Sequence, residues 1–146
     1  MLKQFFTICI ALVSSVCLFS QEKINWDILA DVTYEYEYVE ALNIWHGTPD
    51  FGNKVKAYAD KEISIRGYVI PLQISGDLYM LSAVPYQSCF FCGGAGQETV
   101  MELRMKSDKW RLKTDELLTF TGILRLNDKE LEMSYILENA KPLFNK

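Results

Sequence analysis

Two cysteines separated by two residues are the clearest chemical signal in this chain of 146 residues. Cys89 and Cys92 lie in the segment Pro85–Gly96, which is rich in glycine and aromatic residues. Such a pair serves as two thiolate ligands of a metal ion, as a redox-active dithiol or as a small structural disulfide. A c-type haem site is excluded because Gly93 stands where a histidine is required. The glycines would allow positive φ values that bring the two sulfur atoms together.

The metal interpretation requires ligands beyond the two thiolates. Zinc prefers four ligands in a tetrahedral arrangement. The chain offers His46, its only histidine, and carboxylates such as Glu98 and Glu102. Two soft thiolates would equally suit Cu(I) at a low coordination number. The sequence therefore predicts a site for Zn or Cu at Cys89 and Cys92. Its further ligands would be Glu98 or His46.

A thiol–disulfide redox protein is the alternative function. In thioredoxin-type motifs the first cysteine lies at a helix N-terminus, which lowers the pKa of its thiol. Here a strand pattern precedes the pair, and no helical pattern begins before Val100. The attacking thiolate would be Cys89, which we expect to be the more exposed of the two. No other catalytic set stands at a recognisable spacing, so a non-enzymatic accessory role is favoured over an enzyme.

The first 20 residues have the layout of a secretory signal peptide. Lys3 provides a positive start, and an almost wholly apolar run follows over residues 5–16. This run is short for a membrane-spanning helix, which needs about 20 residues. Cleavage after Ser20 would remove Cys9 and Cys17 and leave the Cys-x-x-Cys pair as the cysteines of the mature chain. The mature protein would be periplasmic or secreted. Lipidation at Cys17 is disfavoured because the residues before it do not fit a lipoprotein signal.

Composition and charge exclude several classes of protein. Hydrophobic residues make up 49% of the chain, which excludes a disordered protein. The net charge is −4, and loss of residues 1–20 removes one lysine and makes it −5. Nucleic-acid binding needs a basic face, so an oligonucleotide-binding barrel is disfavoured. No stretch after residue 20 is long and apolar enough to span a membrane, and we expect a mature chain that does not span it.

An N-terminal extension over residues 21–60 is predicted to carry one strand and a short helix. Residues 24–29 and 53–59 favour short helical segments. Residues 32–39 alternate tyrosines with glutamates, as in a half-buried strand whose tyrosine stripe packs at the core and its rim. Residues 43–53 have the composition of a loop.

A barrel is predicted over residues 61–146. Its five strands cover residues 62–70, 78–84, 98–105, 117–126 and 130–137. Pro71 is expected to end the first strand, and Pro142 to prevent continuation of the last. Gly67 and Gly122 stand within the first and fourth strands, where they would permit the bends of a small closed barrel.

The predicted fold is all-β with one or two short helices, in the form of a five-stranded OB-like closed barrel with an N-terminal extension. An irregular β-sandwich is the alternative. The first and fourth strands should each bury one face in the core, formed by Ile63, Ile65, Val69, Leu118, Phe120 and Leu124.

Three motifs resemble an exported bacterial family of domains of unknown function with an OB-like barrel. They are Gly67-Tyr-Val-Ile-Pro-Leu72, Leu81-Ser-x-x-Pro-Tyr86 and Cys89-Phe-Phe-Cys-Gly-Gly-Ala-Gly96 with Glu98 and Val100. The resemblance covers residues 26–140, with Gln97 in place of an expected proline. It implies the barrel and export. Related domains occur beside metal-uptake or lipoprotein-export-like transporter components, often with a different Cys/His/Pro loop. An envelope transporter component or another envelope protein is the implied partner.

Overall fold

The computed structural model describes residues 21–72, 78–89, 92–129 and 132–144. The predicted signal peptide lies outside these ranges, and so do residues 75–77, whose Ser-Gly-Asp sequence predicts a turn. The strands are β1 Glu22–Lys23, β2 Val32–Val39, β3 Ile44–Phe51, β4 Glu62–Leu72, β5 Leu78–Ser82, β6 Val100–Met105, β7 Leu117–Leu126 and β8 Tyr135–Leu143. Two short α-helices, α1 Trp26–Leu29 and α2 Asn53–Lys56, and two short 3₁₀ turns, η1 Tyr86–Ser88 and η3 Gln97–Thr99, complete the described elements.

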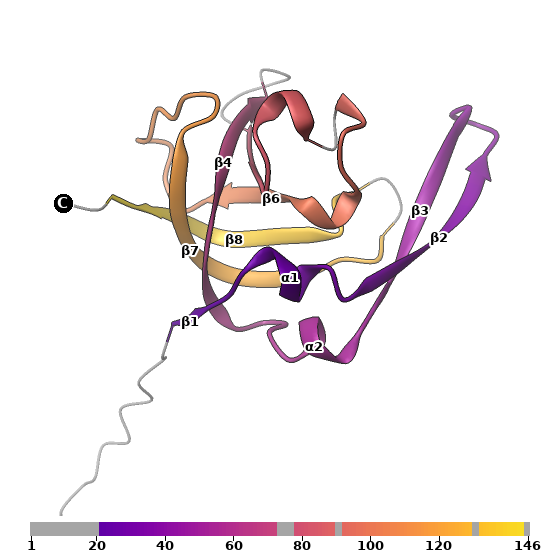
Figure 1. Cartoon of the computed structure of the whole chain (residues 1–146), viewed down its shortest axis with the longest axis horizontal. Coiled ribbons are helices and arrows are strands. Elements are labelled where there is room, and N and C mark those ends of the chain that lie inside the picture. The colour runs from indigo at the N-terminus through magenta and orange to yellow at the C-terminus, as the bar shows by residue number, and fades with distance from the viewer. Residues whose placement is uncertain (1–20, 73–77, 90–91, 130–131, 145–146) are drawn as a thin grey trace, which may run out of the picture.

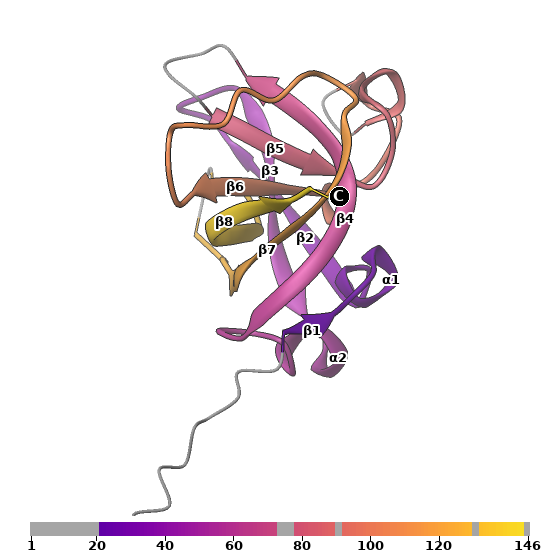
Figure 2. The same cartoon turned by 90° about the vertical axis from the view of Figure 1, so that its left-hand side faces the viewer.

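Strands β4 to β8 form the predicted closed barrel (Figure 1). Their order is β4-β5-β6-β8-β7, and pairing of β4 with β7 closes the ring. The pairing of β6 with β8 is parallel, whereas the other barrel pairings are antiparallel. This arrangement suits the predicted OB-like barrel. Figure 2 shows β4 curving along the whole side of the barrel, and the short strand β1 adds to it in parallel.

The barrel interior contains the predicted core. Alternate residues of a strand point to opposite faces, so each barrel strand contributes every second side chain to the interior. Ile63, Ile65 and Val69 of β4 are buried there with Phe120 and Leu124 of β7. Leu118 is only partly buried and packs against this core from its edge.

The two glycines within strands lie where neighbouring strands approach most closely. A Cβ atom on Gly67 would lie 2.6 Å from the carbonyl oxygen of Ser82. A Cβ atom on Gly122 would lie 2.7 Å from the carbonyl oxygen of Glu138, and the register between β7 and β8 shifts at this point. Both distances are too short for a side chain, so each position requires glycine because a neighbouring strand approaches it closely.

The prediction of a loop over residues 43–53 is wrong. Residues 44–51 form β3, which pairs with β2 in an unbroken antiparallel register from Val32↔Phe51 to Val39↔Ile44. The two strands form a sheet of their own that projects from the barrel (Figure 1). We call this hairpin, residues 32–51, the arm. Its pairing with β2 holds β3 extended although the composition is typical of a loop.

Two expected strand ends are also wrong. β4 continues through Pro71 to Leu72, and β8 continues through Pro142 to Leu143. Pro71 lies beyond the last pairing of β4 with β7, and Pro142 lies beyond the last pairing of β8 with β6. Each proline therefore has a neighbouring strand on one side only, the edge position at which a sheet tolerates proline.

We expect Phe120→Ala to lower the free energy of unfolding by about 3–5 kcal/mol, because it empties a fully buried aromatic site. Leu117→Ala on the same strand is the matched control, since Leu117 is 41% exposed. Urea denaturation followed by circular dichroism measures both. Equal losses for the two variants would contradict the described core.

Candidate functional site

The cysteine segment lies against the outer face of the barrel. Ile70, Met80 and Val100, from β4, β5 and β6, form an apolar cluster separate from the barrel interior. Cys89 is the fourth buried member of this cluster and has no exposed surface. Leu72, Val84 and Met133 pack against the same cluster. The segment after β5 therefore covers the face of the second and third barrel strands, which OB-type proteins use for oligonucleotides and oligosaccharides.

The two thiols lie in one tight turn but differ in exposure. The amide groups of Cys92 and Gly94 both donate to the carbonyl oxygen of Cys89, at 3.1 and 3.2 Å. Gly93 adopts a φ of 72°, as the glycine-rich sequence predicts. Both thiols are free, and Cys92 is exposed. The expectation that Cys89 is the more exposed is wrong, because its side chain fills the apolar cluster. The two residues between the cysteines lie outside the described residues.

The Cys92 thiol is held as a neutral donor. Its Sγ donates to the carbonyl oxygen of Tyr86 at 3.3 Å. Local desolvation and the neighbouring Cys89 thiol raise the pKa of Cys92 above its ordinary value. A reactive thiolate needs the opposite shift, from a nearby cation or a long helix N-terminus. The arrangement therefore favours the protonated form of Cys92 over a reactive thiolate.

The start of the segment is fixed to the barrel by backbone contacts. The Tyr86 amide donates to Oδ1 of Asp115 at 2.8 Å. The Asp115 amide donates in turn to the carbonyl oxygen of Val69 on β4 at 2.9 Å. The carbonyl that receives the Cys92 thiol therefore belongs to a residue tied to the sheet. This contact gives Asp115 a positioning role, which its place in the sequence does not indicate.

The two further ligands predicted from the sequence lie in other surroundings. His46 is on β3 of the arm, opposite Glu37, and its buried Nε2 atom has no hydrogen-bond partner. Glu98 is in η3 near Tyr34 and Tyr135, whose pKa values are raised mainly by burial and further by the charge of Glu98. Within the described ranges, no three side chains of His, Cys, Asp or Glu are grouped so that they could hold a metal ion.

Two thioethers near Cys89 were not singled out from the sequence. Met80 is 2% exposed within the apolar cluster, and Met133 packs against it. Thioether sulfur, like thiolate sulfur, is a soft ligand that suits Cu(I). The alternation of β5 indicates that Met80 faces away from Tyr79 and Leu81. Only the fold could show that the cysteine segment returns to that face.

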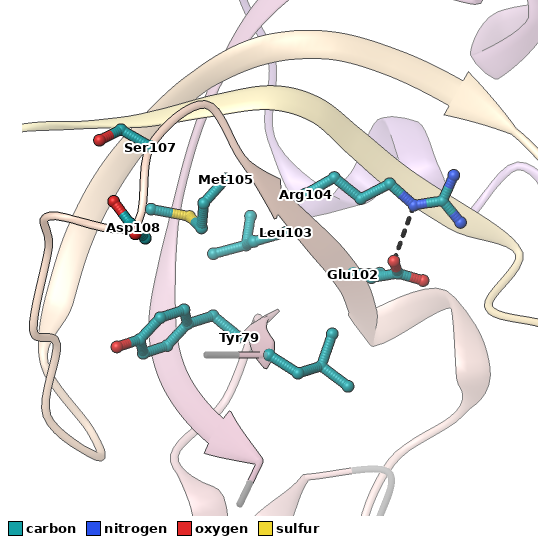
Figure 3. Close-up of a pocket in the computed structure, with 8 residues that line it drawn as sticks. Tyr79, Glu102, Leu103, Arg104, Met105, Ser107 and Asp108 are labelled. Carbon is teal, nitrogen blue, oxygen red and sulfur yellow. Dashed lines mark hydrogen bonds and ion pairs between the residues drawn. The ribbon is translucent and has the colours of Figure 1, made fainter. Parts of the chain in front are cut away.

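A pocket of about 340 Å³ lies away from the thiols, along β5 and β6 (Figure 3). Leu103 and Met105 of β6 and Tyr79 of β5 line its apolar part. At its rim, Nε of Arg104 donates to Oε1 of Glu102 at 2.8 Å, and this bond raises the pKa of Arg104. The pair neutralises its own charge, so the pocket offers less distinctive chemistry than the two thiols.

Comparisons with known proteins show a similarity of fold. No family model matches the sequence, and no curated protein matches it. A crystal structure of a DUF3299 family protein from Pseudomonas aeruginosa superimposes with a TM-score of 0.53 and 15% sequence identity. The match covers 87% of this chain and 99% of that protein. The chain therefore shares its fold with a bacterial protein from a family of unknown function.

Serine substitutions should distinguish the two cysteines by stability. Cys89→Ser places a hydroxyl group in an apolar cluster and should cost about 1–3 kcal/mol of unfolding free energy. Cys92→Ser alters an exposed position and should change it by less than about 0.5 kcal/mol. Both variants should fold, because the barrel core contains neither residue. Urea denaturation in the presence of a reductant tests this, and a reversed order would contradict the burial of Cys89.

The pH dependence of alkylation should report the raised pKa of Cys92. A raised pKa leaves less thiolate at pH 7–8, so the midpoint of the rate of iodoacetamide modification should lie above the ordinary thiol value of about 8.5. In the native Cys92→Ser variant, Cys89 should stay unmodified until the protein is unfolded. A midpoint below 8.5 would indicate an activated thiolate and contradict the neutral-donor arrangement.

Proposed function

We propose that the mature chain is a non-enzymatic accessory protein of the cell envelope that binds one Cu(I) ion between Cys89 and Cys92. The observation that carries the proposal is the placement of both thiols in one turn against an apolar cluster that contains Met80. Export is supported by the signal-like layout of residues 1–20. Among the described residues, no helix is long and apolar enough to cross a membrane.

Copper suits this set of ligands better than zinc. A zinc ion would require two further nitrogen, oxygen or sulfur ligands in a tetrahedral arrangement. Cu(I) accepts few ligands and prefers thiolate and thioether sulfur. Binding would replace the two thiol protons by one ion with two Cu–S bonds, and both protons would pass to solvent. The thioether of Met133, which packs at the edge of the same cluster, is a candidate third ligand.

A thiol–disulfide redox protein is the second candidate, and the difference in exposure favours it. An exposed thiol beside a buried one is suited to attack a disulfide and then be released by its neighbour. In this protein the attacking thiol would be Cys92. The raised pKa of Cys92 and the absence of a helix longer than one turn around the described part of the segment make this activity the weaker proposal.

Titration of the reduced protein with Cu(I), supplied as a chelate, should give about one ion bound per chain and release two protons. The double variant Cys89→Ala/Cys92→Ser should bind none. Met133→Leu should weaken copper binding, whereas Met105→Leu, which alters a thioether packed against the barrel interior, should not. Equal uptake by the double variant would exclude this site, and insulin reduction by the wild type would favour the redox protein.

A further inference from the structure

The arm exposes more large apolar side chains than the rest of the described protein. Among nine exposed residues of this kind, five lie on the arm. They are Tyr36 at 58% exposure, Tyr38 at 46%, Leu42 at 51%, Ile44 at 42% and Trp45 at 68%. Exposed apolar patches that are this concentrated mark interaction sites on soluble proteins. We call the end of the arm that carries these five residues, 36–45, the arm tip. The arm tip is therefore the strongest candidate for a docking surface.

The base of the arm is held firmly, so exposure of the tip does not result from a loose segment. The ring of Phe51 packs against Tyr135, with 5.6 Å between centroids. The Gly52 amide donates to the carbonyl oxygen of Asp31 at 2.7 Å, and the Lys54 amide donates to Oδ2 of Asp31 at 2.8 Å. Phe51 therefore ties the base of the arm to β8, and Asp31 joins the two ends of the hairpin.

Aromatic rings cover one face of the arm tip. Tyr38 and Trp45 are partners in the β2–β3 register, and their ring centroids lie 5.4 Å apart. Tyr36 continues the same face and lies 6.3 Å from Tyr34, which is closer to the barrel. We call Tyr36, Tyr38 and Trp45 the aromatic face. Tryptophan and tyrosine dominate the binding energy of many protein interfaces.

The rest of the arm is acidic. Residues 32–51 contain four carboxylates and no lysine or arginine. Glu35, Glu37 and Asp50 lie on the face opposite the aromatic rings, and Glu40 lies at the turn. Among the described residues, no ion pair engages any of the four. Their charge is therefore available to a partner.

We propose that the arm tip docks into an apolar groove, rimmed by lysine and arginine, on a different protein of the envelope. The aromatic face would enter the groove, and the basic rim would pair with the carboxylates and contact the ring faces as cations. An anionic membrane surface would repel the four carboxylates. A second copy would bring an identical acidic arm on a chain whose net charge is −4. The surface does not depend on the proposed copper site.

The docked partner would also lie close to the cysteine segment. A Cβ atom on Gly47 of β3, the register partner of Tyr36, would lie 3.0 Å from the side-chain nitrogen of Gln97, so the arm touches η3 beside Tyr36. The segment from Cys92 to Gln97 connects this contact with the thiols. A partner on the arm would therefore meet a surface continuous with the candidate metal site.

Photo-crosslinking in living cells tests the docking surface. Trp45→benzoylphenylalanine in the full-length protein should yield one crosslinked product with a different envelope protein. Phe144→benzoylphenylalanine is the matched control, since Phe144 is 57% exposed but outside the arm, and it should not yield this product. The purified partner should then bind the purified protein in calorimetry, and Trp45→Ala should weaken binding by about tenfold or more.

The contribution of the arm carboxylates should be visible in the kinetics of binding to the same partner. Glu37→Gln/Glu40→Gln should slow association several-fold and reduce its dependence on salt, while Phe144→Ala should change neither. A product containing two copies of this chain, binding to phosphatidylglycerol vesicles through Trp45, or no arm-specific product would each overturn the proposal. Binding to the captured partner that is insensitive to both salt and Trp45→Ala would overturn it as well.

Discussion

Burial of Cys89 against the outer face of β4, β5 and β6 is the contact on which the candidate site depends. Closure of the barrel sends alternate side chains inward and leaves Ile70, Met80 and Val100 on the outside. Such a surface is stabilised when another segment removes it from water. The segment after β5 does so with Cys89, and this places the Cys92 thiol at the surface directly beside it. Burial of this outer apolar face thereby sets the position of both sulfur atoms.

This arrangement supports the proposed soft-ion site over nucleophilic chemistry. An apolar environment favours the neutral thiol, and Cys92 keeps its proton in a bond to the Tyr86 carbonyl. A metal ion that forms two Cu–S bonds compensates for loss of both protons, whereas an isolated thiolate has no such compensation. The same packing brings methionine sulfur to the cluster, which no spacing rule for Cys and His would reveal.

The strands with a strong alternation of hydrophobic residues were predictable from the sequence. The strand and the strand ends that depend on pairing with a neighbouring strand were not. Alternation around Ile65 and Phe120, interrupted by a glycine in each strand, was sufficient to predict the bent strands of a closed barrel. Strand β3 was missed because its histidine, glycine and proline favour a loop, whereas its register with β2 makes it a strand. Pro71 and Pro142 misled for a related reason, since each lies where one neighbouring strand has already ended. The Cys-x-x-Cys spacing was enough to single out the two thiols as a candidate site, whereas their exposures follow from contacts between distant segments.

The intact mass of the protein purified from its own cell envelope, measured under native conditions, is the sharpest test of the proposed copper site. We expect the mass of the mature reduced chain, with both thiol protons replaced by one copper ion, and loss of the copper in Cys89→Ala/Cys92→Ser. A metal-free chain lighter by the two hydrogen atoms that a disulfide loses would contradict it, because the pair would then be a covalent link rather than a metal site.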